Sequence, residues 1–248
     1  MNFPPTRLSV VARIRSDDED TRRLAFGTLI EAYWKPAYKY LRLKWQLDPD
    51  EAADLTQEFF TSVLEKDVLA KYDADRARFR TYLRICLDGF ASNARKAEGR
   101  LKRGGGVITV PLDFQTAEGE IVRHEPSVAA DVDEMFYQEW VRTLFQHAVA
   151  DLRGWAQASG RETMFRVFEL YDLAEVSGER PTYADLGRRL GLTATTVTNH
   201  LAAMRRQLRQ HVLDRLRDLT TSDAEFHSEA QRLFGTPAAP AKASADTP

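Results

Sequence analysis

The apolar residues of this chain recur at intervals of three and four over most of its length. Residues 24–45 and 52–66 both show this spacing, which matches the roughly 3.6 residues of an α-helical turn. No segment alternates apolar and polar residues for long enough to indicate a half-buried strand. Pro36 lacks an amide hydrogen and is expected to kink or break the first run, so that two packed helices are expected there. The sequence therefore predicts an all-α fold.

Breaks in this spacing divide the chain into two small helical domains. Three consecutive glycines end the first helical series, and prolines with scattered acidic residues follow them. We expect the first domain over 1–106, an extended linker over 107–130 that has room for a short strand at "VITV", and the second domain over 131–219. Residues 220–248 are expected to form a C-terminal extension with one helix, "SDAEFHSEAQRLF", and a disordered end.

The composition places the chain among soluble globular proteins. Hydrophobic residues make up 43% of the chain and charged residues 29%, which are ordinary values for a globular domain. No apolar run approaches the roughly 18 residues of a membrane span, and the N-terminal residues do not form a secretory signal. We therefore expect a cytoplasmic protein without membrane insertion.

The sequence predicts neither an enzyme nor a metal or cofactor site. Cys86 is the only cysteine, which excludes an internal disulfide framework and a cysteine-based zinc cluster. The five histidines form no HExxH motif, and no glycine-rich phosphate loop is present. A hydrolase or nuclease has little support, and we assign no catalytic residue, metal ligand or cofactor.

Two basic segments flank an acidic one. Residues 71–103 hold 10 basic and 4 acidic side chains, residues 107–180 hold 6 and 14, and residues 181–219 hold 7 and 3. A single basic segment usually marks a solvated face. Two separated ones suit a protein that contacts a polyanion at two places.

The stretch "TYADLGRRLGLTATTVTNHLAAMRR" has the pattern of a helix-turn-helix. Thr182 can cap the first helix, Gly191 can form the turn, and Thr193 can cap the second helix. Such pairs read DNA more often than they serve as plain structural hairpins, although the hairpin stays an alternative. Base edges would meet residues near the start of the second helix, and phosphates would meet its later arginines. The base-contacting candidates are Thr195, Thr196, Thr198, Asn199 and His200, and the phosphate-contacting candidates are Arg205, Arg206 and Arg209. A merely solvent-exposed role for His200 is equally open.

Two segments of the chain together resemble bacterial RNA polymerase sigma factors of the sigma-70 family, extracytoplasmic function group. They read "ADLTQEFFTSVLEKDVLAKYDADRARFRTYLRICLDGFASNARKAEGRLKRGGG" and, after a gap, "PTYADLGRRLGLTATTVTNHLAAMRRQLR". The resemblance extends over roughly residues 24–217 and implies a non-enzymatic initiation factor. Its implied partners are promoter DNA and core RNA polymerase, at the β′ clamp and β flap, and it allows an anti-sigma factor. The first domain would open the −10 element, and the second would read the −35 element.

The resemblance also implies a role for particular residues of the first domain. The polymerase-binding set is Asp54, Gln57, Glu58 and Thr61, on a helix whose start is marked by Asp48 and Glu51. The −10 set is Phe79, Arg80, Tyr82, Asn93, Arg95, Lys96, Arg100, Lys102 and Arg103. Aromatic side chains beside cations can hold an unstacked base, and the cations can bind phosphates. Without the motif, the first set would be an ordinary solvated face; Phe79 and Tyr82 could be core residues, which for Phe79 is the better interpretation.

Departures from the family pattern limit what can be transferred. Gly89 stands where many members carry asparagine, and Thr198, Asn199 and His200 replace a more usual mix with lysine and arginine. The promoter sequence therefore cannot be taken from a relative. The C-terminal extension could contact polymerase, an inhibitor or nothing. The alternative function is a helix-turn-helix repressor or activator that does not join RNA polymerase.

Overall fold

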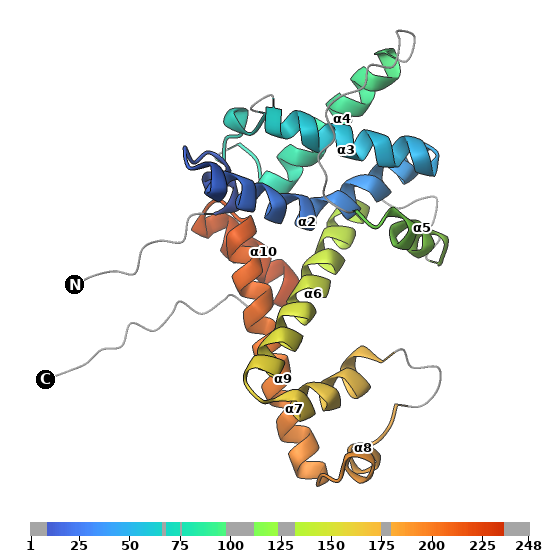
Figure 1. The fold of residues 1–248 in the computed structure, drawn as a ribbon, viewed down its shortest axis with the longest axis vertical. Helices are drawn as coiled ribbons and strands as arrows, with labels where there is room; N and C mark the ends of the chain where they lie inside the picture. The colour runs from blue at the N-terminus through green and yellow to red at the C-terminus, as the bar shows by residue number, and fades with distance from the viewer. Residues whose placement is uncertain are drawn as a thin grey trace, which may run out of the picture. The chain divides into compact units, whose positions relative to one another are not determined.

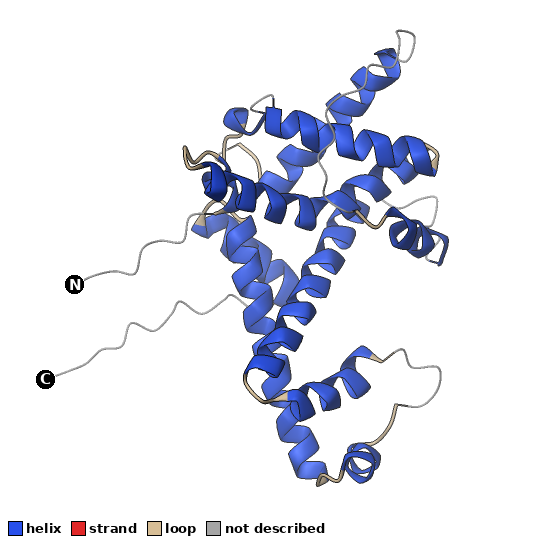
Figure 2. Cartoon of the chain, in the orientation of Figure 1, coloured by secondary structure: helices blue, strands red, loops and turns tan. Residues whose placement is uncertain are grey.

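The computed structural model describes most of the chain, and it does so as helices (Figure 1). The described residues are 9–65, 68–74, 76–97, 112–123, 132–174 and 180–235. Within these ranges every regular element is a helix and none is a strand (Figure 2). The predicted all-α class is therefore confirmed. None of the helices in these ranges is both long enough and apolar enough to cross a membrane.

The described residues pack as two compact units. The larger unit contains those of 1–143 and 216–248, and the smaller unit contains those of 144–215. Helices α6 (Val132–Ala158) and α9 (Ala194–Leu219) each supply residues to both units. The C-terminal extension, which we expected to follow the second domain, thus packs with the N-terminal helices.

The larger unit is built around three helices that contact one another. These are α2 (Glu19–Lys44), α3 (Pro49–Glu65) and α4 (Phe79–Ala97), with α1 (Val10–Ile14) before them and the short 3-10 helix η1 (Val68–Lys71) between the last two. The core of the unit is rich in aromatic side chains, including the buried Tyr33, Tyr38, Phe59, Phe60 and Phe79. The amphipathic spacing seen in the sequence therefore reflects helix faces that are buried in one aromatic core.

Helix α2 continues through Pro36, where we expected the run to divide. An interior proline costs a helix about 3 kcal/mol, because it removes a hydrogen bond and crowds the preceding turn. Here Pro36 and the residues from Lys35 to Leu41 are buried, so tertiary packing holds this stretch helical. The prediction of two separate helices is wrong.

Part of the predicted linker is a helix, α5 (Phe114–Arg123). Its first turn is capped by Asp113, whose Oδ1 accepts from the Thr116 amide at 3.0 Å. The ring of Phe114 packs against Tyr38, with centroids 5.0 Å apart, and Ala117 is fully buried. The prediction of an extended linker is therefore wrong for these residues, because their apolar side chains find a surface on α2. The "VITV" segment lies outside the described residues.

The C-terminal extension forms the predicted helix, α10 (Asp223–Phe234). The hydroxyl of Ser222 caps it by accepting from the Glu225 amide at 3.1 Å, and Gly235 ends it with a φ of 66°. Phe226 and Ala230 are buried within the larger unit. The helix is thus a packed part of that unit.

The smaller unit contains the helix-turn-helix. It consists of α7 (Glu162–Phe168), the π-helical turn η2 (Glu169–Leu173), α8 (Tyr183–Leu190) and parts of α6 and α9. Its core includes the buried Leu152, Phe168, Leu186, Val197, Leu201 and Met204. The predicted capping forms in full: Thr182 and Asp185 make a reciprocal capping box, and Gly191 adopts a φ of 68°.

Gly187 has a specific steric role in the turn between α8 and α9. The carbonyl of Gly187 accepts from the Leu192 amide at 2.8 Å, so the chain folds back over this residue. A Cβ at this position would lie 2.5 Å from the Leu192 carbonyl oxygen. The turn therefore requires a residue without a Cβ at this position.

Candidate nucleic-acid interface

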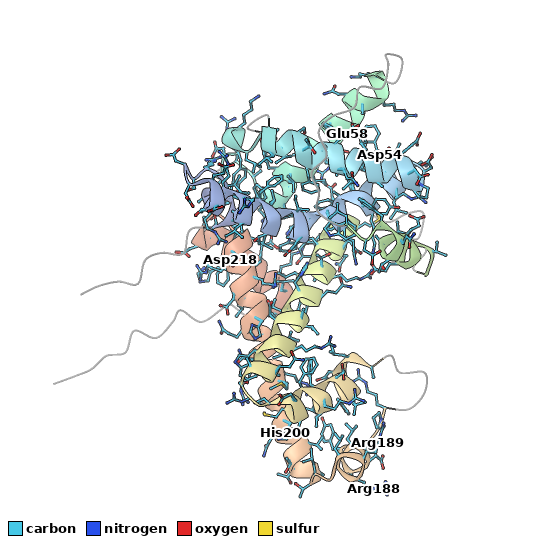
Figure 3. All side chains as sticks on the ribbon, viewed as in Figure 1. Asp54, Glu58, Arg188, Arg189, His200 and Asp218 are labelled. Carbon is cyan, nitrogen blue, oxygen red and sulfur yellow. The ribbon has the colours of Figure 1, made fainter. Side chains whose placement is uncertain are left out.

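The predicted polymerase-binding residues lie on one open face of α3. The start of the helix is capped as predicted, because the Glu51 amide donates to Asp48 Oδ1 at 2.8 Å and the Glu51 carboxylate accepts from the Asp48 amide at 3.3 Å. Asp54 and Glu58 are exposed on this helix (Figure 3), whereas Gln57 and Thr61 are half-exposed. The opposite face is buried in the core, including Phe59 and Phe60.

The start of α4, where the predicted −10 set begins, is covered. Phe79 is 1% exposed, and its ring makes an edge contact with Tyr72 at 5.2 Å between centroids. Arg80 is 8% exposed, and its guanidinium lies over the rings of Tyr137 and Trp140, 4.4 and 4.8 Å from their centroids. Both side chains are therefore part of the packed interior of the larger unit.

Tyr82 is also held by the fold. Its hydroxyl donates to the Val68 carbonyl at 2.6 Å, and its ring lies 5.3 Å from that of Tyr72. Burial raises the pKa of Tyr82 to about 12, so that the phenol stays protonated and keeps this donated hydrogen bond. The side chain thus links α4 to η1.

The second half of α4 is open. Asn93, Arg95 and Lys96 are exposed, and they remain available for a base or a phosphate. The other predicted −10 residues, Arg100, Lys102 and Arg103, lie outside the described residues. Among the described members of the predicted −10 set, the fully exposed ones are therefore Asn93, Arg95 and Lys96.

Between these two regions, Asp88 organises a cluster of cations and aromatic groups that the sequence did not reveal. Its carboxylate accepts from Tyr40 Oη and Lys44 Nζ, both at 2.9 Å, and from Trp45 Nε1 at 3.1 Å. Arg84 Nη1 donates to it at 3.0 Å. Partial burial would raise the pKa of Asp88, but hydrogen bonds from Lys44, Tyr40 and Trp45 outweigh it and lower the pKa. The cation of Arg84 is therefore committed to a contact within the chain.

The start of α9 carries the predicted base-reading residues. Thr193 caps the helix by accepting from the Thr196 amide at 3.1 Å. Thr195, Thr198 and Asn199 are exposed, whereas Thr196 is half-buried. The hydroxyl of Thr198 donates to the Ala194 carbonyl at 3.0 Å, which leaves its lone pairs and its methyl group for a base.

His200 is half-buried on α9 (Figure 3). Its Nδ1 is buried and has no hydrogen-bond partner among the described residues. A purely solvent-exposed role, which the sequence left open, does not describe this side chain.

The predicted phosphate contacts of α9 differ in availability. Arg205 makes a bidentate ion pair with Asp172, with Nε–Oδ2 and Nη2–Oδ1 distances of 2.9 and 2.8 Å. These hydrogen bonds raise the pKa of Arg205 and tie the helix to the π-helical turn. Arg206 is exposed and Arg209 is half-exposed. We therefore regard Arg206 as the more available cation for a DNA phosphate and Arg205 as a positioning residue.

Two arginines that the sequence reasoning did not select lie on α8. Arg188 and Arg189 are exposed there (Figure 3), and Arg188 pairs with Asp185 one turn earlier. The first helix of a helix-turn-helix crosses the DNA backbone when the second enters the major groove. The signal that could have found them is the pair of cations in the last turn of α8.

No group of three or more histidine, cysteine, aspartate or glutamate side chains in the described part of the chain is placed to hold a metal ion.

No protein-family model matches the chain, and no curated protein or solved structure is significantly similar to it. The assignment of its surfaces therefore depends on the two sequence motifs and on the geometry described above.

Proposed function

We propose that this protein is a sigma factor of the extracytoplasmic function group, which binds core RNA polymerase and directs it to promoters. The observation that carries the proposal is the open face of α3 with Asp54, Gln57, Glu58 and Thr61. A helix-turn-helix by itself is shared by many unrelated regulators, but such a regulator has no need of a second polar surface of this pattern. Acidic and amide side chains on one helix face suit a basic partner helix.

In this proposal the smaller unit reads the −35 duplex. Thr195, Thr198 and Asn199 are exposed where the start of a recognition helix meets base edges, and Asn199 can pair bidentately with adenine. Arg206 binds the DNA backbone and contributes affinity without sequence preference. Each good base contact contributes about 1 to 3 kcal/mol of discrimination.

The larger unit captures the unpaired −10 strand. Asn93, Arg95 and Lys96 present an amide and two cations on the open half of α4, a combination that suits a base and its neighbouring phosphates. Capture of the open strand favours melting, because these contacts exist only after the duplex has opened. The protein thus acts through differential binding and needs no catalysis of its own.

A second candidate is a helix-turn-helix repressor or activator that never joins polymerase. The burial of Phe79 and Arg80 favours it, because these two residues of the predicted melting surface are not open to DNA. This candidate predicts tight duplex binding by the protein alone and no complex with core polymerase.

Binding to core RNA polymerase separates the two candidates. We expect the wild-type chain to co-purify with core enzyme, and the double variant Gln57→Ala/Glu58→Ala to bind it at least about tenfold more weakly. Asp17→Ala serves as the control, since Asp17 is exposed in the same unit but is not a residue of α3. If the wild-type chain does not bind core enzyme, the sigma-factor proposal is wrong. Equal affinity of the double variant and the wild type would exclude this face as the interface.

A further inference from the structure

The C-terminal helix α10 places a carboxylate at the start of α4. Glu225 Oε1 accepts from the Phe79 amide at 3.0 Å, and Glu225 Oε2 accepts from the Thr221 amide at 2.8 Å. The first amides of a helix have no partner within the helix and attract anions. Because α4 has no acidic residue in its own first turn, the anion at this position comes from α10.

A second carboxylate of α10 occupies the arginines beside that helix end. Glu229 Oε1 lies 2.9 Å from Arg78 Nη1 and 3.2 Å from Arg80 Nη2. Arg78 Nη2 also donates to Ser228 Oγ at 2.8 Å. Two guanidinium groups and a helix N-terminus form the kind of donor set that binds a phosphate. In this structure all three are satisfied by groups of α10.

The contact with α10 leaves one oxygen of Glu229 unsatisfied. The side chain of Glu229 is 2% exposed, and its Oε2 is buried with no hydrogen-bond partner among the described residues. A buried acceptor without a partner has a free-energy cost. Release of α10 would remove this cost, whereas Arg78, which is 41% exposed, already offers an edge that a phosphate can reach.

The rest of α10 is held by apolar packing and by further ion pairs, such as that of Arg232 with Glu134. Phe226 and Ala230 are 5% and 1% exposed, and the Arg217 guanidinium lies 3.7 Å from the centroid of the Phe226 ring. Deletion of the helix would therefore expose core residues of the larger unit. Substitution of the two carboxylates tests the electrostatic contact and leaves this apolar packing in place.

We propose that α10 masks a phosphate-binding surface at the start of α4 and that single-stranded nucleic acid displaces it. The surface consists of Arg78, Arg80 and the Phe79 amide, and the carboxylates of Glu225 and Glu229 occupy it in place of phosphates. This inference rests on the proposed function for its biological setting: α10 holds the start of the −10 helix closed until the open strand is present. Asn93, Arg95 and Lys96, at the other end of α4, make the first contact.

The test is the affinity of the full chain for fluorescently labelled oligo(dT), measured by anisotropy. We expect Glu225→Gln/Glu229→Gln to bind about tenfold tighter than the wild type, because the two substitutions remove the anions that compete with phosphate. A plot of the logarithm of the association constant against the logarithm of the salt concentration should also have a steeper negative slope, by roughly 1 to 1.5. Two additional phosphate contacts imply a change of this size for a single strand. The control Asp17→Asn/Asp50→Asn makes the same change of net charge at exposed positions of this unit and should bind within about twofold of the wild type.

Equal affinity of the Glu225→Gln/Glu229→Gln variant and the wild type, or equal gains in this variant and the control, would overturn the inference. Hydrogen exchange of the wild-type chain gives a test that does not depend on a variant folding correctly. Amides of residues 223–234 should lose protection when oligo(dT) binds, and unchanged protection would overturn the inference. Failure of the chain to bind core polymerase would remove the sigma-factor proposal and leave a masked single-strand site, so the two failures are distinguishable.

Discussion

The two surfaces predicted to contact DNA differ in how much of each is open. In the smaller unit, Thr195, Thr198 and Asn199 are exposed at the start of α9. In the larger unit, two residues at the start of α4 are buried: the Phe79 ring packs against Tyr33 and Tyr72, and Arg80 is covered by residues from α6 and α10. A sequence motif therefore predicts which helix carries a residue. Whether that side chain is exposed to a ligand depends on tertiary contacts with distant parts of the chain.

The difference has a physical origin in the range of the contacts. The helix-turn-helix is fixed by interactions between near neighbours, such as the capping box of Thr182 and the hydrogen bond that the Thr196 amide donates to Thr193 Oγ1. The start of α4 is fixed by partners far along the chain, including Trp140 and Glu229. Substitutions at the two surfaces should accordingly change different properties, affinity in the first and stability in the second.

The largest expected effect is on the folding of the larger unit. Arg80→Ala should destabilise it by about 3 to 5 kcal/mol, because the change removes a partner of the buried Glu229 and the cation that stacks on two aromatic rings. Arg95→Ala, at the exposed end of the same helix, should change stability by less than about 0.5 kcal/mol. Urea unfolding measures the stability of both variants. Similar losses of unfolding free energy in the two would contradict the distinction between a buried start and an exposed end of α4.

A smaller loss of stability is expected in the smaller unit. Gly187→Ala should cost about 1 to 3 kcal/mol, because the new Cβ would lie 2.5 Å from the Leu192 carbonyl oxygen. Gly154→Ala is the matched control, since nothing lies within 4 Å of a Cβ at that position of α6, and alanine in a helix interior should stabilise by about 0.5 to 1 kcal/mol. We expect thermal unfolding to show a lower melting temperature for Gly187→Ala and a higher one for Gly154→Ala than for the wild type. A stable Gly187→Ala variant would show that the turn can relax.

Substitution of Asn199 is expected to change DNA recognition at a single base pair. Asn199→Ala should lower discrimination at one base pair of the upstream element by about 1 to 3 kcal/mol, whereas Arg206→Ala should weaken binding to all sequences alike. Selection of preferred duplexes from a random pool, followed by measurement of affinity, separates the two patterns. A uniform loss for Asn199→Ala would assign this side chain to the backbone instead.

The smallest expected effect is the response of the two units to acid. The pKa of Asp88 in the larger unit is lowered by hydrogen bonds that outweigh its burial, and the pKa of Asp151 in the smaller unit is lowered by hydrogen bonds from Arg215. A folded-state pKa below the unfolded value of about 3.9 stabilises the fold above that pH and ceases to do so as the pH falls through the folded value. Asp88→Asn and Asp151→Asn should each flatten the fall of unfolding free energy between about pH 5 and pH 2. A slope identical to that of the wild type would show that the group does not titrate differently on folding.

The sequence was sufficient to predict the fold class, the helix-turn-helix and the capped start of α3, because each of these follows from spacing and local caps. It did not predict α5, although the cap at Asp113 and the spacing of Phe114, Ala117 and Ile121 were present, because nearby prolines and acids favoured an extended linker. Burial of Arg80 could not be predicted, since it depends on aromatic rings and a carboxylate brought together only by tertiary packing.

The central claim is that the chain gives core RNA polymerase the ability to start at specific promoters. The most direct measurement is run-off transcription by core enzyme on genomic fragments with and without the full-length chain. The proposed function predicts discrete transcripts that appear only with the chain and that disappear with Gln57→Ala/Glu58→Ala. Tight duplex binding by the chain without a discrete transcript from any fragment would contradict it and support the repressor or activator instead.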